Sequence, residues 1–292
     1  MNNNLLNMAL QLSVQDMFSS SWFSGALMNK VWMEMMRSSV NGLMRKTGGA
    51  DLLGAALGGN LRGDAAMLRQ ASSNVAEAHA MMSMAATAAG NIAGQLKEAQ
   101  TLADDFLALA PGDPNRAALQ AQYEAISKNI DSIIQNTKYN GITLLDGSAW
   151  GGDERLSITR DTSNNPLAAS VHIQSGDSGF PLAFNNMGLE FADIAGKHTL
   201  VDDSGGGSGP WPPRPAVLSE LSSLQRSAQT LADLYSGRAG SLWSQSTSLQ
   251  SQAKILEEAA AQRAKTPAPV STENLLLNLI LRDGGGIFSG KG

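Results

Sequence analysis

Apolar residues between positions 68 and 106 recur in alternating steps of three and four, the spacing that places them on one face of an α-helix. The pattern persists for more than five heptads and predicts a long coiled-coil helix. Many of these residues are alanines, and small side chains let neighbouring helix axes approach closely. The larger members, which we predict to belong to a core and assembly seam, are Val75, Met82, Ile92, Leu96 and Phe106.

A short break at 110–116, "APGDPNR", ends this helix. Asp113 is expected to cap the next helix, with Pro114 at its first position. The same alternation then continues through three further seam residues, and two helices joined by so short a turn should lie antiparallel. These three residues are Leu119, Ile126 and Ile130.

Two turn signals follow in "NTKYNGITLLDG", residues 136–147. Asn140-Gly141 is the preferred pair for a type I′ turn and predicts a β-hairpin, and Asp146-Gly147 predicts a second turn. Helical periodicity is lost beyond this point. "ASVHIQ" at 169–174 and "KHTLV" at 197–201 predict short strands in a small β-rich insert.

The glycine- and proline-rich stretch "DDSGGGSGPWPPRP" at 202–215 predicts a linker. Helical spacing resumes at Val217, with polar members at Arg238, Gln245 and Gln252. Because neither long helix can bury its apolar face alone, the helices before and after the insert should pair. The apolar seam residues of this second helix are Leu221, Leu224, Leu231, Leu242, Leu249 and Leu256.

The predicted fold is therefore mostly α: long paired coiled-coil-like helices from both chain ends, with a β-hairpin and a small β-rich insert. We divide the chain into five segments. They are an N-terminal helical assembly arm (1–60), N-terminal core helices with the hairpin (61–150), a variable β-rich insert and linker (151–215), a C-terminal core helix (216–265), and a C-terminal assembly helix and tail (266–292).

Both ends of the chain are apolar. A methionine-rich stretch, "MNKVWMEMMRSSVNGLM" at 28–44, favours packing between subunits, with a local core in the monomer as the alternative. "TENLLLNLIL" at 272–281 predicts a short apolar helix. "GGADLLGAALGGNLRG" at 48–63 lacks the lysine and hydroxyl of a phosphate-binding loop and is interpreted as a flexible joint.

Composition narrows the function classes. The 292 residues include no cysteine, 16% are charged and the net charge is −5, so disulfides are excluded and nucleic acid is not an expected partner. Neither a Sec signal peptide nor a membrane-spanning run is evident, so no stable membrane insertion is expected. The three histidines lack ligand spacing, and no catalytic constellation is evident, so we expect no metal, no cofactor and no enzymatic activity.

The stretch 115–147 closely resembles the bacterial flagellin signature, in which a helix ends in N-T-x-[FY]-N-G-x-x-L-L-[DS]-G. The preceding "DPNRAALQAQYEAI" also resembles the turn and helix of that family, and the ends of the chain resemble it more loosely. The residues that match the signature are Asn136, Thr137, Tyr139, Asn140, Gly141, Leu144, Leu145 and Gly147.

The resemblance implies a subunit that is exported unfolded through the flagellar type III channel and polymerises outside the cell. The terminal helices would form the inner tube of the filament, and the variable middle would face solvent. Implied partners are further copies of the chain, an export chaperone, and the filament cap and hook-junction proteins.

"QLKEAQ" at 95–100 stands where many flagellins carry an arginine-rich patch that faces neighbouring subunits and a Toll-like receptor. Gln95, Lys97 and Glu98 occupy the matching positions. The bidentate arginine contacts are lost, which argues against recognition by an innate immune receptor and leaves a solvated helix face as the plain interpretation.

The expected function is a structural subunit that self-assembles into an extracellular bacterial flagellar filament for motility. Two alternatives stay open: a hook–filament junction protein, and a secreted coiled-coil binding module that does not polymerise.

Overall fold

The structure, a computed structural model, describes residues 50–110, 112–176, 178–198, 200 and 214–265. The predicted N-terminal assembly arm up to residue 49, with its methionine-rich stretch, lies outside the described residues. So do nearly all of the predicted linker and the C-terminal assembly helix and tail.

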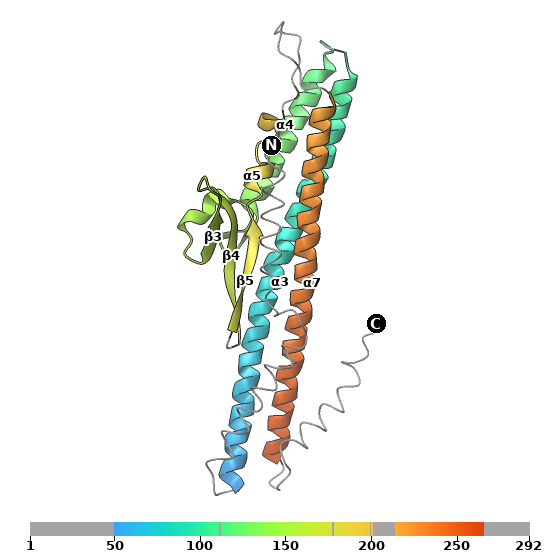
Figure 1. Ribbon diagram of the computed structural model, residues 1–292. Coiled ribbons are helices and arrows are strands. Elements are labelled where there is room, and N and C mark those ends of the chain that lie inside the picture. Colours follow the sequence, from blue (N-terminus) through green and yellow to red (C-terminus); the bar gives the residue numbers. More distant parts are fainter. Residues whose placement is uncertain (1–49, 111, 177, 199, 201–213, 266–292) are drawn as a thin grey trace. The chain divides into compact units, whose positions relative to one another are not determined.

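The elements follow the predicted order of helices, hairpin, small sheet and helix (Figure 1). The mostly-α fold with long helices before and after the sheet is therefore confirmed. The elements are α3 (Ala50–Ala108), α4 (Asn115–Asn136), β1 (Lys138–Tyr139), β2 (Ile142–Thr143), the 3₁₀ helix η2 (Gly147–Gly152), β3 (Leu156–Arg160), β4 (Pro166–Ser175), β5 (Ser178–Asn185), α5 (Gly188–Phe191), α6 (Ile194–Lys197) and α7 (Arg214–Lys265).

Helix α3 already includes Ala50, so the flexible joint expected at 48–63 is wrong for the described residues of that stretch. The reason is that its apolar face extends further upstream than residue 68. Leu61 and Ala65 are buried at helical spacing before Leu68, and this burial outweighs the low helix propensity of the neighbouring glycines.

The chain forms two compact units, each assembled from separate stretches of sequence. The first contains α3 up to Ala76, the segment Gln174–Gly179 and α7 from Trp243 onward. The second contains Glu77–Ile173 and Phe180–Leu242. The five-segment division of the sequence stays a prediction.

In the first unit α3 and α7 run antiparallel, because Arg69 pairs with Glu257 while Ser72, further along α3, contacts Ser246, earlier on α7. The buried serines bond reciprocally: the Ser72 hydroxyl donates to the Ser246 carbonyl at 2.9 Å, and the Ser246 hydroxyl donates to the Ser72 carbonyl at 3.0 Å. The Asn74 amide also donates to the carbonyl of Gln174.

In the second unit α3 and α7 are antiparallel as well. His79 contacts the carbonyl of Ala239 at 2.9 Å, and further along α3 a Cβ on Gly90 would lie 4.0 Å from Ala232. Helix α4 folds back beside α3 (Figure 1). At the turn between them, the buried Arg116 guanidinium lies 4.3 Å from the ring centroid of Phe106.

The start of α4 lies one residue later than predicted, with Pro114 as the N-cap and Asn115 as the first helical residue. The Asn115 amide donates to the Asp113 carboxylate at 2.8 Å, and Pro114 already has helical dihedral angles. Helix boundaries commonly differ by a residue or two between definitions. The last two residues of the predicted linker, Arg214 and Pro215, belong to α7, where a proline in the first turn costs no hydrogen bond.

The small sheet has the strand order β3-β4-β5. β4 contains the predicted strand at 169–174, whereas β3 and β5 were not predicted. The strand expected at 197–201 is wrong for its described residues, because Lys197 ends helix α6. That helix is capped by Asp193, whose carboxylate accepts from the Gly196 amide at 3.1 Å.

The end of the predicted insert is part of the core of the second unit rather than solvent-facing. Phe184, Met187, Phe191 and Ile194 are each at most 1% exposed. Backbone amides of this stretch also donate to helix side chains, among them Ala195 to the Ser127 hydroxyl of α4. These residues thus belong to the subunit core, and the expectation that the variable middle faces solvent in a filament stays a prediction.

Candidate functional site: the hairpin and its supports

Thr137 turns the chain from α4 into the hairpin. Its amide and its hydroxyl both donate to the carbonyl of Ile133, at 3.1 and 2.6 Å, which closes the helix end. Its own carbonyl accepts from the amide of Leu144 at 2.9 Å, on the far side of the hairpin. One residue of the signature thus ends the helix and fixes where the returning strand begins.

The hairpin turn has the predicted chemistry. Tyr139 pairs with Ile142, and the two residues between them, Asn140 and Gly141, have φ angles of 47° and 81°. Positive φ at both central positions is the mark of a type I′ turn, which asparagine and glycine tolerate best. The predicted hairpin is confirmed.

The leucines after the hairpin anchor it to the core. Leu144 and Leu145 have no solvent exposure, and Trp150 of η2 is 1% exposed. The Trp150 indole nitrogen donates to the carbonyl of Thr143 at 2.7 Å, so the ring satisfies its polar group while it packs against the hairpin.

Asp146 caps the 3₁₀ helix by accepting from the amide and the hydroxyl of Ser148, at 2.9 and 2.7 Å. The predicted second turn at Asp146-Gly147 is present and continues into η2. At Gly147 the need for glycine is steric: a Cβ there would lie 2.1 Å from the amide nitrogen of Asn186 and 2.5 Å from its Cγ.

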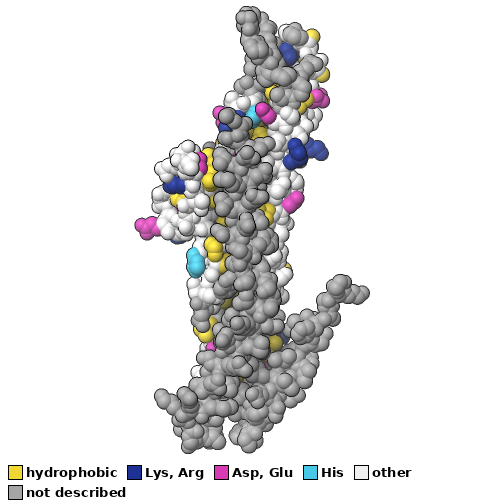
Figure 2. Space-filling model, in the orientation of Figure 1, with side chains coloured by type: hydrophobic (Ala, Val, Ile, Leu, Met, Phe, Trp, Pro, Cys, Tyr) yellow, Lys and Arg dark blue, Asp and Glu magenta, His cyan; other side chains and the backbone are white. Residues whose placement is uncertain are grey.

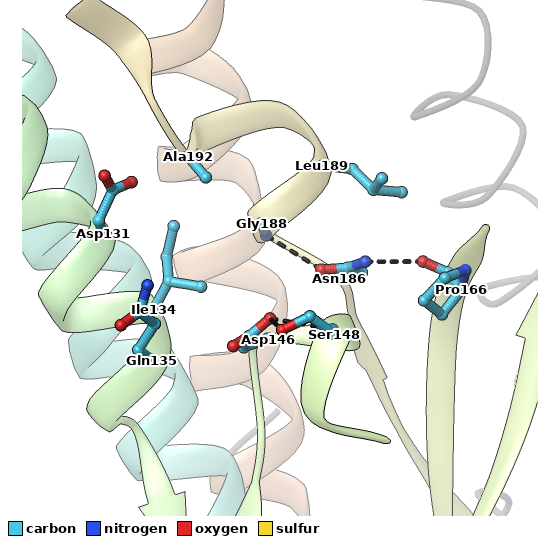
Figure 3. A pocket seen from close by; sticks show the side chains of 10 residues that line it. All are labelled: Asp131, Ile134, Gln135, Asp146, Ser148, Pro166, Asn186, Gly188, Leu189 and Ala192. Carbon is cyan, nitrogen blue, oxygen red and sulfur yellow. Dashed lines mark hydrogen bonds between the residues drawn. The ribbon is translucent and has the colours of Figure 1, made fainter. Parts of the chain in front are cut away.

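Asn186 is the support that sequence reasoning missed (Figure 3). Its side-chain oxygen accepts from the amides of Gly147 at 2.9 Å and Gly188 at 3.1 Å, and its side-chain nitrogen donates to the carbonyl of Pro166 at 2.7 Å. The next amide, that of Met187, donates to Leu145 at 2.9 Å. Asn186 therefore joins the hairpin region, by which we mean residues 137–147, to β4 and α5. No local pattern in the sequence pairs it with Gly147.

A hollow of about 330 Å³ lies beside this junction (Figure 3). It sits between the second half of α4 and the turn that carries Asn186. Its volume is at the small end of ligand pockets. The residues that line it are Asp131, Ile134, Gln135, Asp146, Ser148, Pro166, Asn186, Gly188, Leu189 and Ala192.

Two titratable groups, a buried tyrosine on α4 and a half-buried glutamate on α5, have shifted pKa values. Burial is the main cause that raises the pKa of the Tyr123 phenol, with Glu220 adding to it, and this hydroxyl donates to the carbonyl of His198 at 2.9 Å. Burial also raises the pKa of the Glu190 carboxyl, against the opposing effects of Ser227 and Lys197.

The predicted seam residues lie in the interior of the units, with Leu119 as the exception because it is only half-buried. Their proposed contribution to assembly stays a prediction. Those that are buried are Val75, Met82, Ile92, Leu96, Phe106, Ile126, Ile130, Leu221, Leu224, Leu231, Leu242, Leu249 and Leu256.

The predicted receptor-facing patch is a polar helix surface. Lys97 and Glu98 are exposed and Gln95 is half-buried, with a long contact of 3.5 Å between the Gln95 amide and Glu98. On the face shown in Figure 2, charged side chains are scattered rather than gathered into one patch. Recognition of this patch stays a prediction.

The described part of the chain contains no group of three or more histidine, aspartate or glutamate side chains placed to hold a metal ion. Among the same residues, no helix has the length and apolar character needed to cross a membrane.

Comparison with known proteins agrees with this architecture. Residues 29–149 match the model of the bacterial flagellin N-terminal helical region. The matched stretch includes α3 from Ala50 onward, its return through α4 and the hairpin, so this part of the chain is similar to the N-terminal helical region of flagellins. A flagellin from Clostridium tyrobutyricum is similar to this chain, with 29% identity over 153 residues, which cover 51% of this chain and 41% of that protein. Both findings support the flagellin family.

Proposed function

We propose that this chain is a structural subunit that self-assembles outside the cell into a bacterial flagellar filament. The observation that carries the proposal is the match over residues 29–149, which includes α3 from Ala50 onward, α4 and the hairpin. Motility follows in this proposal because a filament turned by a motor acts as a propeller. Non-catalytic action fits a family whose members are structural proteins.

The mode of assembly is proposed from the sequence of the two ends. Residues 1–45 are rich in Leu and Met, and residues 272–281 are rich in Leu. So many apolar side chains need a partner to cover them in water. Neighbouring copies would supply that cover through repeated heterologous contacts, which extend into a filament when the rotation does not close. Before assembly, an export chaperone would cover the same surface.

The test is polymerisation of the purified chain, followed by electron microscopy. We expect long filaments from the complete chain and none from a version trimmed to residues 61–260. Circular dichroism of the trimmed version checks that its helices remain. Filaments from the trimmed chain would refute assembly through the ends.

Other outcomes separate the alternatives. Rings or short caps without filaments would favour a hook–filament junction protein, and persistent monomers would favour a binding module. In cells, loss of this chain should remove or shorten the filament, and unchanged filaments and swimming would contradict the proposal.

A further inference from the structure

The phenol of Tyr235 joins helix α7 to the end of β5, next to the residues that support the hairpin. The Tyr235 ring is fully buried, and its hydroxyl oxygen accepts a hydrogen bond from the backbone amide of Asn185 at 2.8 Å. The ring also contacts Phe184, with 6.3 Å between the ring centroids. The last residues of β5 are therefore held on α7 by a short directional hydrogen bond as well as by packing.

The residues that follow on this strand are the supports of the hairpin region. Asn186 accepts from the Gly147 amide, and the Met187 amide donates to the Leu145 carbonyl. The residue that Tyr235 bonds, Asn185, is therefore the sequence neighbour of Asn186, which holds Gly147 at the end of the signature. The chain of contacts runs from α7 through Asn185–Met187 to 145–147, and all of it belongs to the second unit.

The buried contact between β5 and α7 contains several polar groups. One turn after Tyr235, Arg238 reaches the carbonyl of Ala183 at 3.5 Å, and its other terminal nitrogen is buried without a hydrogen-bond partner. The side-chain oxygen of Asn185, a residue 3% exposed, is also buried and unpartnered. Burial raises the pKa of Tyr235 to about 12 and lowers the pKa of Arg238.

Buried polar groups with unmet hydrogen bonds destabilise a fold, and apolar residues of similar size would pack here at less cost. What the polar groups provide is direction, because a hydrogen bond to one backbone amide admits one register of the strand on the helix. Packing of Phe184 alone would allow the strand end to shift.

We propose that Tyr235 is a positioning residue through which the C-terminal core helix fixes the conformation of the hairpin region. The hydroxyl holds Asn185, which places Asn186 and Met187 against residues 145–147. A disturbance of α7 near Tyr235 is then transmitted to the signature, although the two lie about 90 residues apart in sequence.

The test compares two tyrosine variants by hydrogen exchange on the complete, unassembled chain. Tyr235→Phe removes the hydroxyl and keeps the ring. Tyr123→Phe is the matched control, since that phenol is also buried and also bonds a backbone group, the His198 carbonyl, away from the hairpin. We expect Tyr235→Phe to speed exchange of the amides at 144–147 and 185–188 by about three- to tenfold, and Tyr123→Phe to leave them unchanged.

A second measurement places the effect in the contact chain. In an Asn186→Ala background, adding Tyr235→Phe should no longer change exchange at Gly147, because the connecting side chain is already gone. Unchanged exchange at 144–147 in Tyr235→Phe, or equal acceleration there by both tyrosine variants, would overturn the proposal. The measurement uses monomer, so its result is independent of whether the chain forms filaments.

Discussion

Replacing Gly147 by alanine tests the site with a single methyl group. The new Cβ would lie 2.1 Å from Nδ2 and 2.5 Å from Cγ of Asn186, far inside contact distance. Asn186 is short and bonded to three backbone groups, so it must leave its place to relieve the overlap. The cost is therefore set by the hydrogen bonds lost, not by the methyl group itself.

Three hydrogen bonds at a net 0.5–1.5 kcal/mol each amount to roughly 1.5–4.5 kcal/mol of unfolding free energy. Gly151 in the same 3₁₀ helix is the control, because a Cβ there meets no atom within 4 Å and its φ is not positive. Gly151→Ala should change stability by less than about 1 kcal/mol, in the stabilising direction if at all.

The assay is urea unfolding followed by far-ultraviolet circular dichroism on Gly147→Ala, Gly151→Ala, Asn186→Ala and the double variant at 147 and 186. We expect the double variant to be no less stable than Asn186→Ala alone, since the overlap is gone. Equal stabilities of the two glycine variants would refute the steric explanation of this signature position.

Three further changes have defined outcomes. Valine at both Asn140 and Gly141 should cost about 1–3 kcal/mol by forcing β-branched residues to positive φ, and normal melting and filaments would contradict the turn. Glu190→Gln should raise the melting temperature at neutral pH, because a carboxyl with a raised pKa destabilises the fold when ionised; the gain should shrink as pH falls through that pKa, and a gain that grows in acid would contradict the burial argument. Replacing 180–198 by a glycine-serine linker should abolish cooperative unfolding of the second unit, since four large buried side chains are lost at about 1.5–3 kcal/mol each, whereas shortening the exposed turn 161–165 should not.

The helices and the hairpin could be predicted because each has a local signal. Heptad spacing marked the faces of α3 and α7, and Asn140-Gly141 marked the turn through its φ requirements. The short strands and helices of the insert have few residues each, and their pattern cannot distinguish a strand from a capped turn. Lys197 was misassigned for this reason, because the cap at Asp193 decides its conformation.

The supports of the site could not be predicted because they depend on contacts between distant residues. Asn186 is 39 residues from Gly147, and its role is set by the fold that brings β5 beside η2. Tyr235 has the spacing of an ordinary core residue, and nothing in that spacing indicates a hydroxyl bonded to a strand amide. The sequence signature therefore identified the hairpin but not what holds it.

The paired serines of the first unit favour one axial alignment of α3 and α7, so any sliding of the two helices would occur in steps. Ser72 and Ser246 each satisfy the other's hydroxyl and backbone carbonyl, so one axial alignment serves both. A shift of one helical turn, about 5.4 Å, would break both hydroxyl–carbonyl hydrogen bonds, at a net cost of about 0.5–1.5 kcal/mol each. Strain along this pair would thus be stored as bending until a threshold is passed, rather than released by gradual slippage.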